Sequence, residues 1–157
     1  MGVMRVLHVA PEAYPLAKVG GLADVVGALP KALGPLGVEA HVLLPWHGGL
    51  EARRVGEVAF AFSGREEWAP LGERVEGGVR FLLLGVEGFG RERVYGYPDD
   101  AERYLRFALA AKEVARGYDL VHAHDWTAAV LALYAPTVYS IHNLAHQGLV
   151  DPGLFFS

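Results

Sequence analysis

Cysteine is absent from this sequence of 157 residues, so the chain can form neither a disulfide nor a thiolate metal site. The absence fits a reducing compartment, and we expect a cytoplasmic protein. The start of the chain also lacks an apolar run long enough to span a membrane. The apolar stretch at residues 6–10 has only the length of a strand. We therefore expect a protein without a membrane partner.

A block of basic residues is lacking as well. The chain has 14 lysines and arginines against 18 aspartates and glutamates, which gives a formal net charge of -4. The electrostatic footprint of a nucleic-acid-binding protein is therefore absent, and we expect no nucleic-acid partner. Any anionic ligand must be held by local geometry rather than by a broad positive field.

Apolar stretches and helical patterns alternate along a chain that is about one domain long. The sequence predicts buried strands at residues 4–10, 38–44, 79–85, 119–126 and 137–143. Helical spacing predicts helices at residues 21–33, 99–117 and 127–135, with Pro30 kinking or dividing the first. Residues 53–78 are predicted to form a hairpin-like excursion. This alternation indicates an α/β fold, a Rossmann-like three-layer domain with a mainly parallel sheet covered on both faces.

The loop after the first strand combines a lysine with two glycines at a helix start. Lys18 would add a full positive charge to the free N–H groups of the helix, and Gly20 and Gly21 would let a ligand approach the backbone closely. This combination suits a pyrophosphate, although its spacing matches neither the dinucleotide fingerprint nor the P-loop. A glycine-rich turn with a solvated lysine is the alternative.

Histidines and a carboxylate follow the strand at residues 119–126. His122 and His124 fall on one face of that strand, and Asp125 stands at its end. Such a set suits zinc, but ordinary hydrogen bonds are the stronger expectation because no zinc motif accompanies it. Asp125 would lie at the edge of the sheet where ligands bind, and its carboxylate could bind sugar hydroxyls there.

The last predicted strand also ends in polar side chains. His142 and Asn143 offer both donors and acceptors, which suits the recognition of hydroxyl groups; the alternative is that they merely fix a loop. Tyr95, Tyr97 and Trp126 could offer stacking surfaces to a sugar ring, although aromatic residues are more often simply packed. The lysine turn and both polar strand ends are predicted to share one edge of the sheet.

Several segments together resemble the bacterial glycogen synthase and plant starch synthase family, in that family's order and over nearly the whole chain. They are "MRVLHVAPEAYPLAKVGGLADVVGALPKAL", "VEAHVLLP", "YPDDAERY", "DLVHAHDWTAAVLALY" and "TVYSIHNLAHQG". The resemblance implies an incomplete N-terminal half of a GT-B glycosyltransferase. It also implies the retaining transfer of glucose from ADP-glucose to the non-reducing end of an α-1,4-glucan, with no cofactor and no metal.

The family's motifs assign roles to matching residues. The resemblance implies that Lys18, Gly20 and Gly21 hold the phosphates of the donor. It implies catalytic roles for Asp125, which would bind the transferred glucose or the acceptor, and for His142. The imidazole of His142 would lie beside the donor glucose and help to stabilise positive charge that develops at its anomeric carbon.

Other positions carry supporting roles or departures. The resemblance implies that Asn143 and Gln147 support sugar binding and that Tyr97 contributes to the acceptor site. Val19 stands where the family usually has threonine, and His146 stands where it usually has tyrosine. The first change removes a hydroxyl near the phosphates, while the lysine and glycines around it are retained.

The largest departure is that the family's C-terminal nucleotide-binding domain has no counterpart in these 157 residues. That domain supplies an arginine and lysine pair and a glutamate, so we expect the chain alone to be inactive, a truncated domain or one that requires a second chain. Two alternatives remain: a related glycosyltransferase that uses another nucleotide sugar, or a non-catalytic module that binds glucan or a partner. The terminal residues 153–157 slightly favour the module, because they leave apolar side chains uncovered.

Overall fold

A computed structural model describes residues 2–143 and 153, and within these residues the strands form one sheet in the order β3-β4-β5-β2-β1-β6-β7. Its parallel part consists of β1 (Met4–Val9), β2 (Val38–Pro45), β5 (Val79–Leu84), β6 (Leu120–His124) and β7 (Thr137–Ser140). The remaining strands, β3 (Arg53–Phe62) and β4 (Arg65–Glu76), are antiparallel to their neighbours. The prediction of a Rossmann-like, mainly parallel sheet is therefore confirmed.

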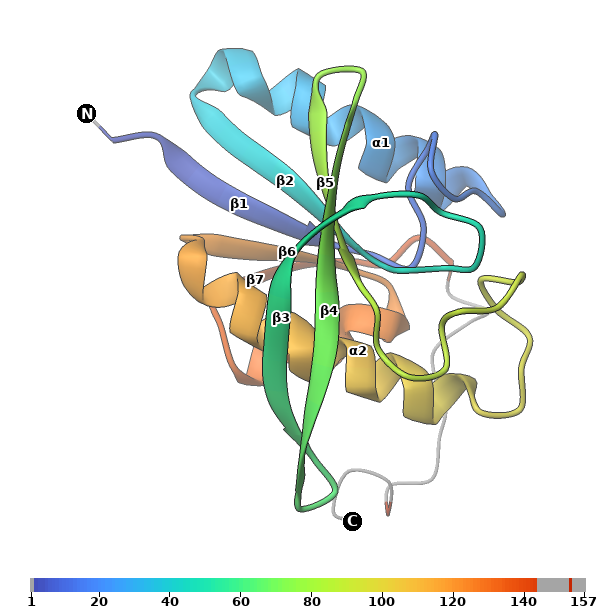
Figure 1. The fold of residues 1–157 in the computed structure, drawn as a ribbon. Helices are drawn as coiled ribbons and strands as arrows, with labels where there is room; N and C mark the ends of the chain where they lie inside the picture. Colours follow the sequence, from blue (N-terminus) through green and yellow to red (C-terminus); the bar gives the residue numbers. More distant parts are fainter. Residues whose placement is uncertain (1, 144–152, 154–157) are drawn as a thin grey trace.

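Helices cover both faces of the parallel strands. Figure 1 shows α1 (Gly21–Leu33) and α2 (Asp100–Val114) on opposite sides of the sheet. The short 3-10 helices η1 (Gly34–Leu36) and η2 (Ala115–Gly117) end them, and η3 (Trp126–Leu133) packs beside α2. Among the residues with described positions, no helix is both long and apolar enough to span a bilayer.

The central strand β2 shows why its sequence is almost continuously apolar. Val42 and Leu44 point into the core under α1, and Leu43 points into the core under α2. All three side chains are fully buried. A parallel strand with helices on both faces has no solvent side, so it lacks the alternation that marks a half-exposed strand.

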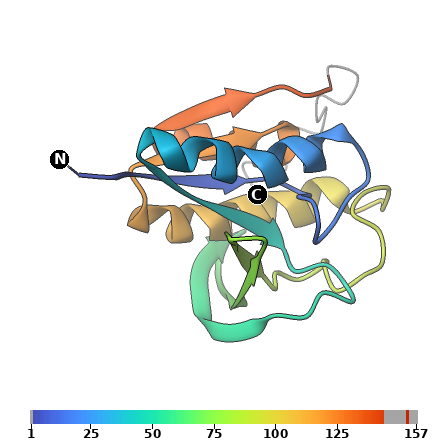
Figure 2. The ribbon, with the colours of Figure 1, turned by 90° about the horizontal axis from the view of Figure 1, so that it is seen from above.

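The predicted excursion at residues 53–78 is a long β-hairpin. Ser63 and Gly64 form its turn with φ angles of 51° and 74°, the left-handed region that a tight two-residue hairpin turn requires. Figure 2 shows the hairpin, in green, projecting on the side of the sheet away from β7. Strand β3 packs against α2, so the hairpin extends the core under that helix.

The structure refines two predictions about helices. Pro30 does not divide α1, which runs unbroken from Gly21 to Leu33. Pro30 has no N–H to donate, but its carbonyl still accepts the N–H of Gly34. Leu22, Val26 and Pro30 are buried at four-residue intervals, so packing against the sheet holds the helix together.

The segment predicted as a short helix at residues 127–135 is the 3-10 helix η3, Trp126–Leu133. This connection must return along the length of β6, because β7 is parallel to β6. The five residues of β6 span ~16 Å. The eight residues of η3 cover ~16 Å as a 3-10 helix but only ~12 Å as an α-helix. The short connection therefore favours the more extended helix.

Candidate active site at the carboxyl edge of the sheet

A cavity of about 660 Å³ lies where β6 and β7 end and α1 begins. Five residues predicted from the sequence line it together, namely Gly20, Gly21, Asp125, His142 and Asn143. Val19, noted in the sequence as a departure from the family's threonine, also lines it, and the sequence did not single out several others, namely Glu12, Leu22, Val25, Gly96, Asp100 and Thr127. Of the aromatic candidates, Tyr95 and Trp126 are in the lining. Gln147 falls outside the described residues.

The turn before α1 leaves open space at the cavity wall. Gly20 precedes the helix in an extended conformation and has no side chain of its own to cap the N–H groups of the first turn. A Cβ atom added at Gly20 or Gly21 would meet nothing within 4 Å. The glycines are therefore not required by packing within the domain, and their bare backbone is open to a ligand at the positive end of the helix dipole.

Glu12 reaches this helix start from the loop after β1. Its side chain is 2% exposed, and its carboxylate accepts the backbone N–H of Val19 at 2.5 Å. Burial raises the pKa of Glu12, which hydrogen bonds from the Val19, Gly20 and Ala23 amides partly oppose. The sequence did carry a signal for Glu12, an acidic residue in the loop that follows the first strand, because that loop lies on the ligand edge.

Lys18 lies beside the cavity rather than in its lining. Its ammonium group pairs with both carboxylate oxygens of Asp24 on the first turn of α1, at 2.8 and 2.7 Å. The two side chains are about half exposed, and exposed ion pairs contribute only ~0–1 kcal/mol. The lysine can therefore leave Asp24 at little cost when an anion lies near Gly20.

Asp125 connects the ends of β6 and β7. Its carboxylate accepts the backbone N–H of His142 at 2.6 Å, and its own N–H donates to the Ser140 carbonyl at 2.9 Å. The residue has φ 60° and ψ -177°, a region that is almost restricted to glycine. Such strain persists where surrounding contacts fix the backbone, as they do here, and it clusters at functional sites.

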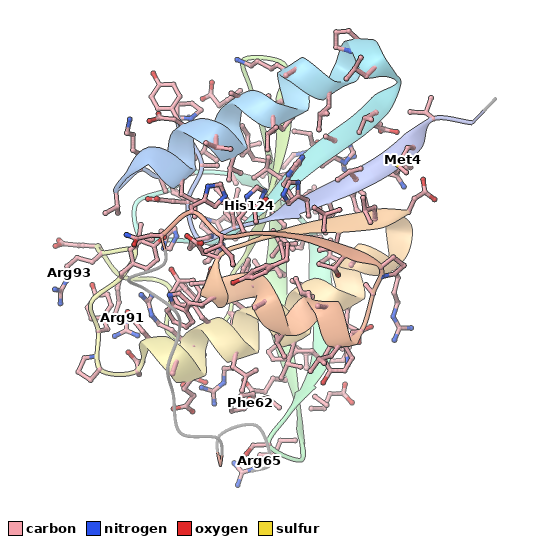
Figure 3. The ribbon with its side chains drawn as sticks, turned by 180° about the vertical axis from the view of Figure 1, so that it is seen from behind. Met4, Phe62, Arg65, Arg91, Arg93 and His124 are labelled. Carbon is pink, nitrogen blue, oxygen red and sulfur yellow. The ribbon has the colours of Figure 1, made fainter. Side chains whose placement is uncertain are left out.

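The imidazole of His142 continues into a group of histidines beneath the cavity. Its Nε2 lies 2.9 Å from Nδ1 of His124, and Nε2 of His124 lies 3.1 Å from Nδ1 of His8. Burial lowers the pKa of His8 to about 4 and that of His124 to about 2, with further lowering of both by the neighbouring His122. His8 and His124 are therefore neutral at physiological pH, and Figure 3 shows His124 in the interior at the strand end.

Ring nitrogens of His8, His122 and His124 lie within 4.8 Å of one another, a separation that would suit a metal ion. The ring orientations do not fit one. His122 stacks on His124 with 16° between the ring planes, so the lone pairs of these two rings run side by side instead of converging. Nε2 of His122 is also hydrogen bonded to Oγ of Ser140 at 2.7 Å. The arrangement favours hydrogen bonding over metal ligation.

Tyr97, predicted for the acceptor site, lies outside the cavity lining, whereas Tyr95 is part of it. The Tyr97 hydroxyl accepts the backbone N–H of Arg93 at 3.1 Å. The guanidinium groups of Arg91 and Arg93 lie 4.1 and 4.5 Å from the centre of its ring. Figure 3 shows both arginines on the loop that precedes α2, at the outside of the molecule.

A mainly parallel sheet with helices on both faces and a cavity at its carboxyl edge defines a Rossmann-like α/β domain. The chain belongs to the starch synthase catalytic domain family, which it matches over residues 5–157. The family predicted from the motifs is therefore confirmed, and the fold is that of part of a GT-B catalytic domain.

Individual relatives agree with this assignment. The chain is 97% identical over 154 residues to a glycogen synthase of Thermus thermophilus, covering 98% of this chain and 35% of that protein. It is 41% identical over 158 residues to a glycogen synthase of Deinococcus deserti, covering 92% of this chain and 34% of the relative. This chain thus spans about a third of the length of these proteins.

A solved structure shares the fold. The catalytic domain of starch synthase IV from Arabidopsis thaliana, bound to ADP and acarbose, has a TM-score of 0.88 and 27% sequence identity to this chain. The similarity covers 100% of this chain and 37% of that one.

Proposed function

We propose that this chain forms one wall of the active site of a glycogen synthase, which transfers glucose from ADP-glucose to the non-reducing end of an α-1,4-glucan with retention of configuration. The observation that carries the proposal is the cavity that unites the glycine turn of α1 with Asp125 and His142. The near-identity to the Thermus glycogen synthase supports the reaction, and the ADP in the Arabidopsis starch synthase structure supports the donor.

The start of α1 would bind the diphosphate of the donor. Gly20 and Gly21 leave space at the positive end of the helix, and Lys18 would leave Asp24 to add its charge. The carboxylate of Glu12 already accepts an amide hydrogen at this turn. A phosphate would therefore compete with Glu12 or bind beside its protonated form.

Asp125 and His142 would face the glucose that is transferred. Oδ1 of Asp125 is occupied by the amide of His142, which leaves its other oxygen for a sugar hydroxyl. The ring of His142 would lie beside the anomeric carbon and stabilise the positive charge that develops there. Asn143 and Gln147 would assist, and Tyr97 would serve the acceptor from outside the lining of this cavity.

Negative charge develops on the diphosphate as it departs. Among the described residues, this wall offers Lys18 and the start of α1 as positive groups, and these alone do not neutralise that charge. Catalysis requires groups placed around the transition state from all sides. We propose that the remaining groups come from a nucleotide-binding domain, in the same polypeptide or a second chain, and that residues 1–157 alone turn over little substrate.

A chimera tests the proposal. Residues 1–157 would replace the matching segment of the Thermus thermophilus glycogen synthase, and transfer of labelled glucose from ADP-glucose and UDP-glucose into glycogen would be measured. We expect activity with ADP-glucose, a fall of about a hundredfold for His142→Ala, and a weaker affinity for ADP in Lys18→Gln. Glu66→Gln and Lys31→Gln, both at exposed positions, are the matched controls. A folded chimera without glucose transfer would refute the proposal.

Within the described residues, one apolar edge of the sheet supports the module hypothesis. Strand β7 is at the edge of the sheet, and Val138, Tyr139 and Ile141 are 46%, 42% and 58% exposed. An apolar edge of this kind suits a covering polypeptide. A monomeric chain that binds no glycogen in sedimentation measurements would count against a binding module.

A further inference from the structure

Three histidines from distant parts of the chain form one continuous line of ring contacts that ends in the cavity. His8 belongs to β1, His124 to β6, and His142 follows β7. The nitrogen atoms lie 3.1 Å apart between His8 and His124 and 2.9 Å apart between His124 and His142. His8 and His124 are 0% exposed, so water does not compete for these contacts.

We propose that His8, acting through His124, fixes the tautomer and the orientation of the His142 ring, so that His142 presents Nδ1–H to an oxygen atom of the ligand and not to its anomeric carbon. His8 would then be a positioning residue for the reaction, and this catalytic consequence rests on the proposed function. The tautomer of His142 does not depend on the proposed function.

The chemistry of imidazole leaves only two hydrogen-bond patterns for a chain of neutral rings. Each ring has one N–H and one lone pair, and each contact needs one of each. In the first pattern His8 donates from Nδ1 to His124, and His124 donates from Nδ1 to Nε2 of His142. In the second pattern every bond is reversed, so His142 donates from Nε2 and the proton of His8 lies on its Nε2.

The far nitrogen of His8 decides between the patterns. Within the described part of the chain, Nε2 of His8 is buried and has no hydrogen-bond partner. The second pattern would leave an N–H there without an acceptor, which is rare in folded proteins, whereas the first leaves only a lone pair. The first pattern is therefore favoured, and it places the proton of His142 on Nδ1.

Two replacements of His8 separate positioning from packing. Phenylalanine keeps a buried ring but removes the donor. Asparagine supplies an N–H at about the place of Nδ1, so it retains the link to His124. His41→Phe is the matched control, because His41 is also a buried strand histidine but bonds to the hydroxyl of Tyr118 rather than to this chain of rings.

Nitrogen NMR of histidine-labelled protein reads the tautomer directly, with signals assigned by single replacements. We expect His142 to show a protonated Nδ1 and an unprotonated Nε2 in the wild-type chain, in His8→Asn and in His41→Phe. In His8→Phe the two nitrogens should move toward averaged values. A wild-type His142 protonated on Nε2, or a tautomer unchanged in His8→Phe, would overturn the proposal.

Activity in the Thermus chimera tests the catalytic consequence. We expect His8→Phe to lower kcat by about tenfold or more with little change in KM, since it misplaces a reacting group. His8→Asn should restore most of the kcat, and His41→Phe should leave it unchanged. A tautomer that responds without any change in kcat would overturn the positioning role alone. A chimera that is inactive throughout would instead refute the proposed function and leave the NMR result standing.

Discussion

Oδ1 of Asp125 accepts the backbone N–H of His142 at 2.6 Å, so the carboxylate after β6 fixes the backbone just beyond β7. The two proposed catalytic residues therefore hold each other in place. The backbone of Asp125 has a φ angle of 60°, which residues other than glycine rarely adopt.

This relationship predicts a difference between two replacements of Asp125. Both Asp125→Ala and Asp125→Gly lose the hydrogen bond to His142, but only glycine also relieves the backbone strain. We expect Asp125→Gly to be more stable than Asp125→Ala by about 1 kcal/mol, measured by urea denaturation. Equal stabilities, or a more stable alanine variant, would show that the backbone at this position is not strained.

Two glycines of α1 should respond in opposite ways to alanine. A Cβ atom at Gly27 would lie 2.4 Å from the carbonyl oxygen of Tyr14, whereas one at Gly21 would meet nothing within 4 Å. We expect Gly27→Ala to reduce the free energy of unfolding by about 1–3 kcal/mol. Gly21→Ala should leave it unchanged or raise it slightly but weaken ADP binding, measured by calorimetry. If Gly21→Ala bound ADP normally, the phosphate would not lie at this turn.

The buried histidines predict a loss of stability in acid. His8 and His124 have pKa values lowered from 6.5 to about 4 and about 2. Below pH 6.5 the unfolded chain therefore takes up protons that the folded chain does not, and stability falls as the pH falls. Each histidine should contribute about 1 kcal/mol per pH unit between pH 6 and pH 5, and the contribution of His8 should shrink as the pH approaches its folded pKa of about 4. Urea denaturation of the wild type and of His8→Phe should show a shallower slope in the variant.

Glu12 predicts a pH dependence of the opposite sign. Its pKa is raised above 4.5, mainly by burial, so the folded protein holds this proton more tightly than the unfolded chain does. The contribution of Glu12 to stability therefore decreases as the pH rises from 4.5 through the folded pKa. The stability of the wild type relative to Glu12→Gln should fall over this range. Glu12→Gln should also bind ADP several-fold more tightly, because a negative charge near the phosphates is removed.

The sheet and the cavity could be predicted from the sequence because each depends on local patterns of residues. Apolar runs located the buried strands, and the rule that ligands bind at strand ends brought Gly20, Asp125 and His142 together in advance. Properties that depend on distant partners were not predictable. Tyr97 and Tyr95 are two residues apart in similar sequence, and only the fold shows that Tyr95 lines the cavity while arginines cover Tyr97. Likewise, nothing near Lys18 in the sequence indicated its pairing with Asp24 rather than with solvent.

The link between His8 and His124 joins residues that are 116 positions apart. During synthesis, the first strand and the glycine turn leave the ribosome long before the segments that complete the wall of the cavity. This wall of the cavity can thus assemble only after the segment that carries His142 has been synthesised, so ligand binding here would report that these distant segments have come together.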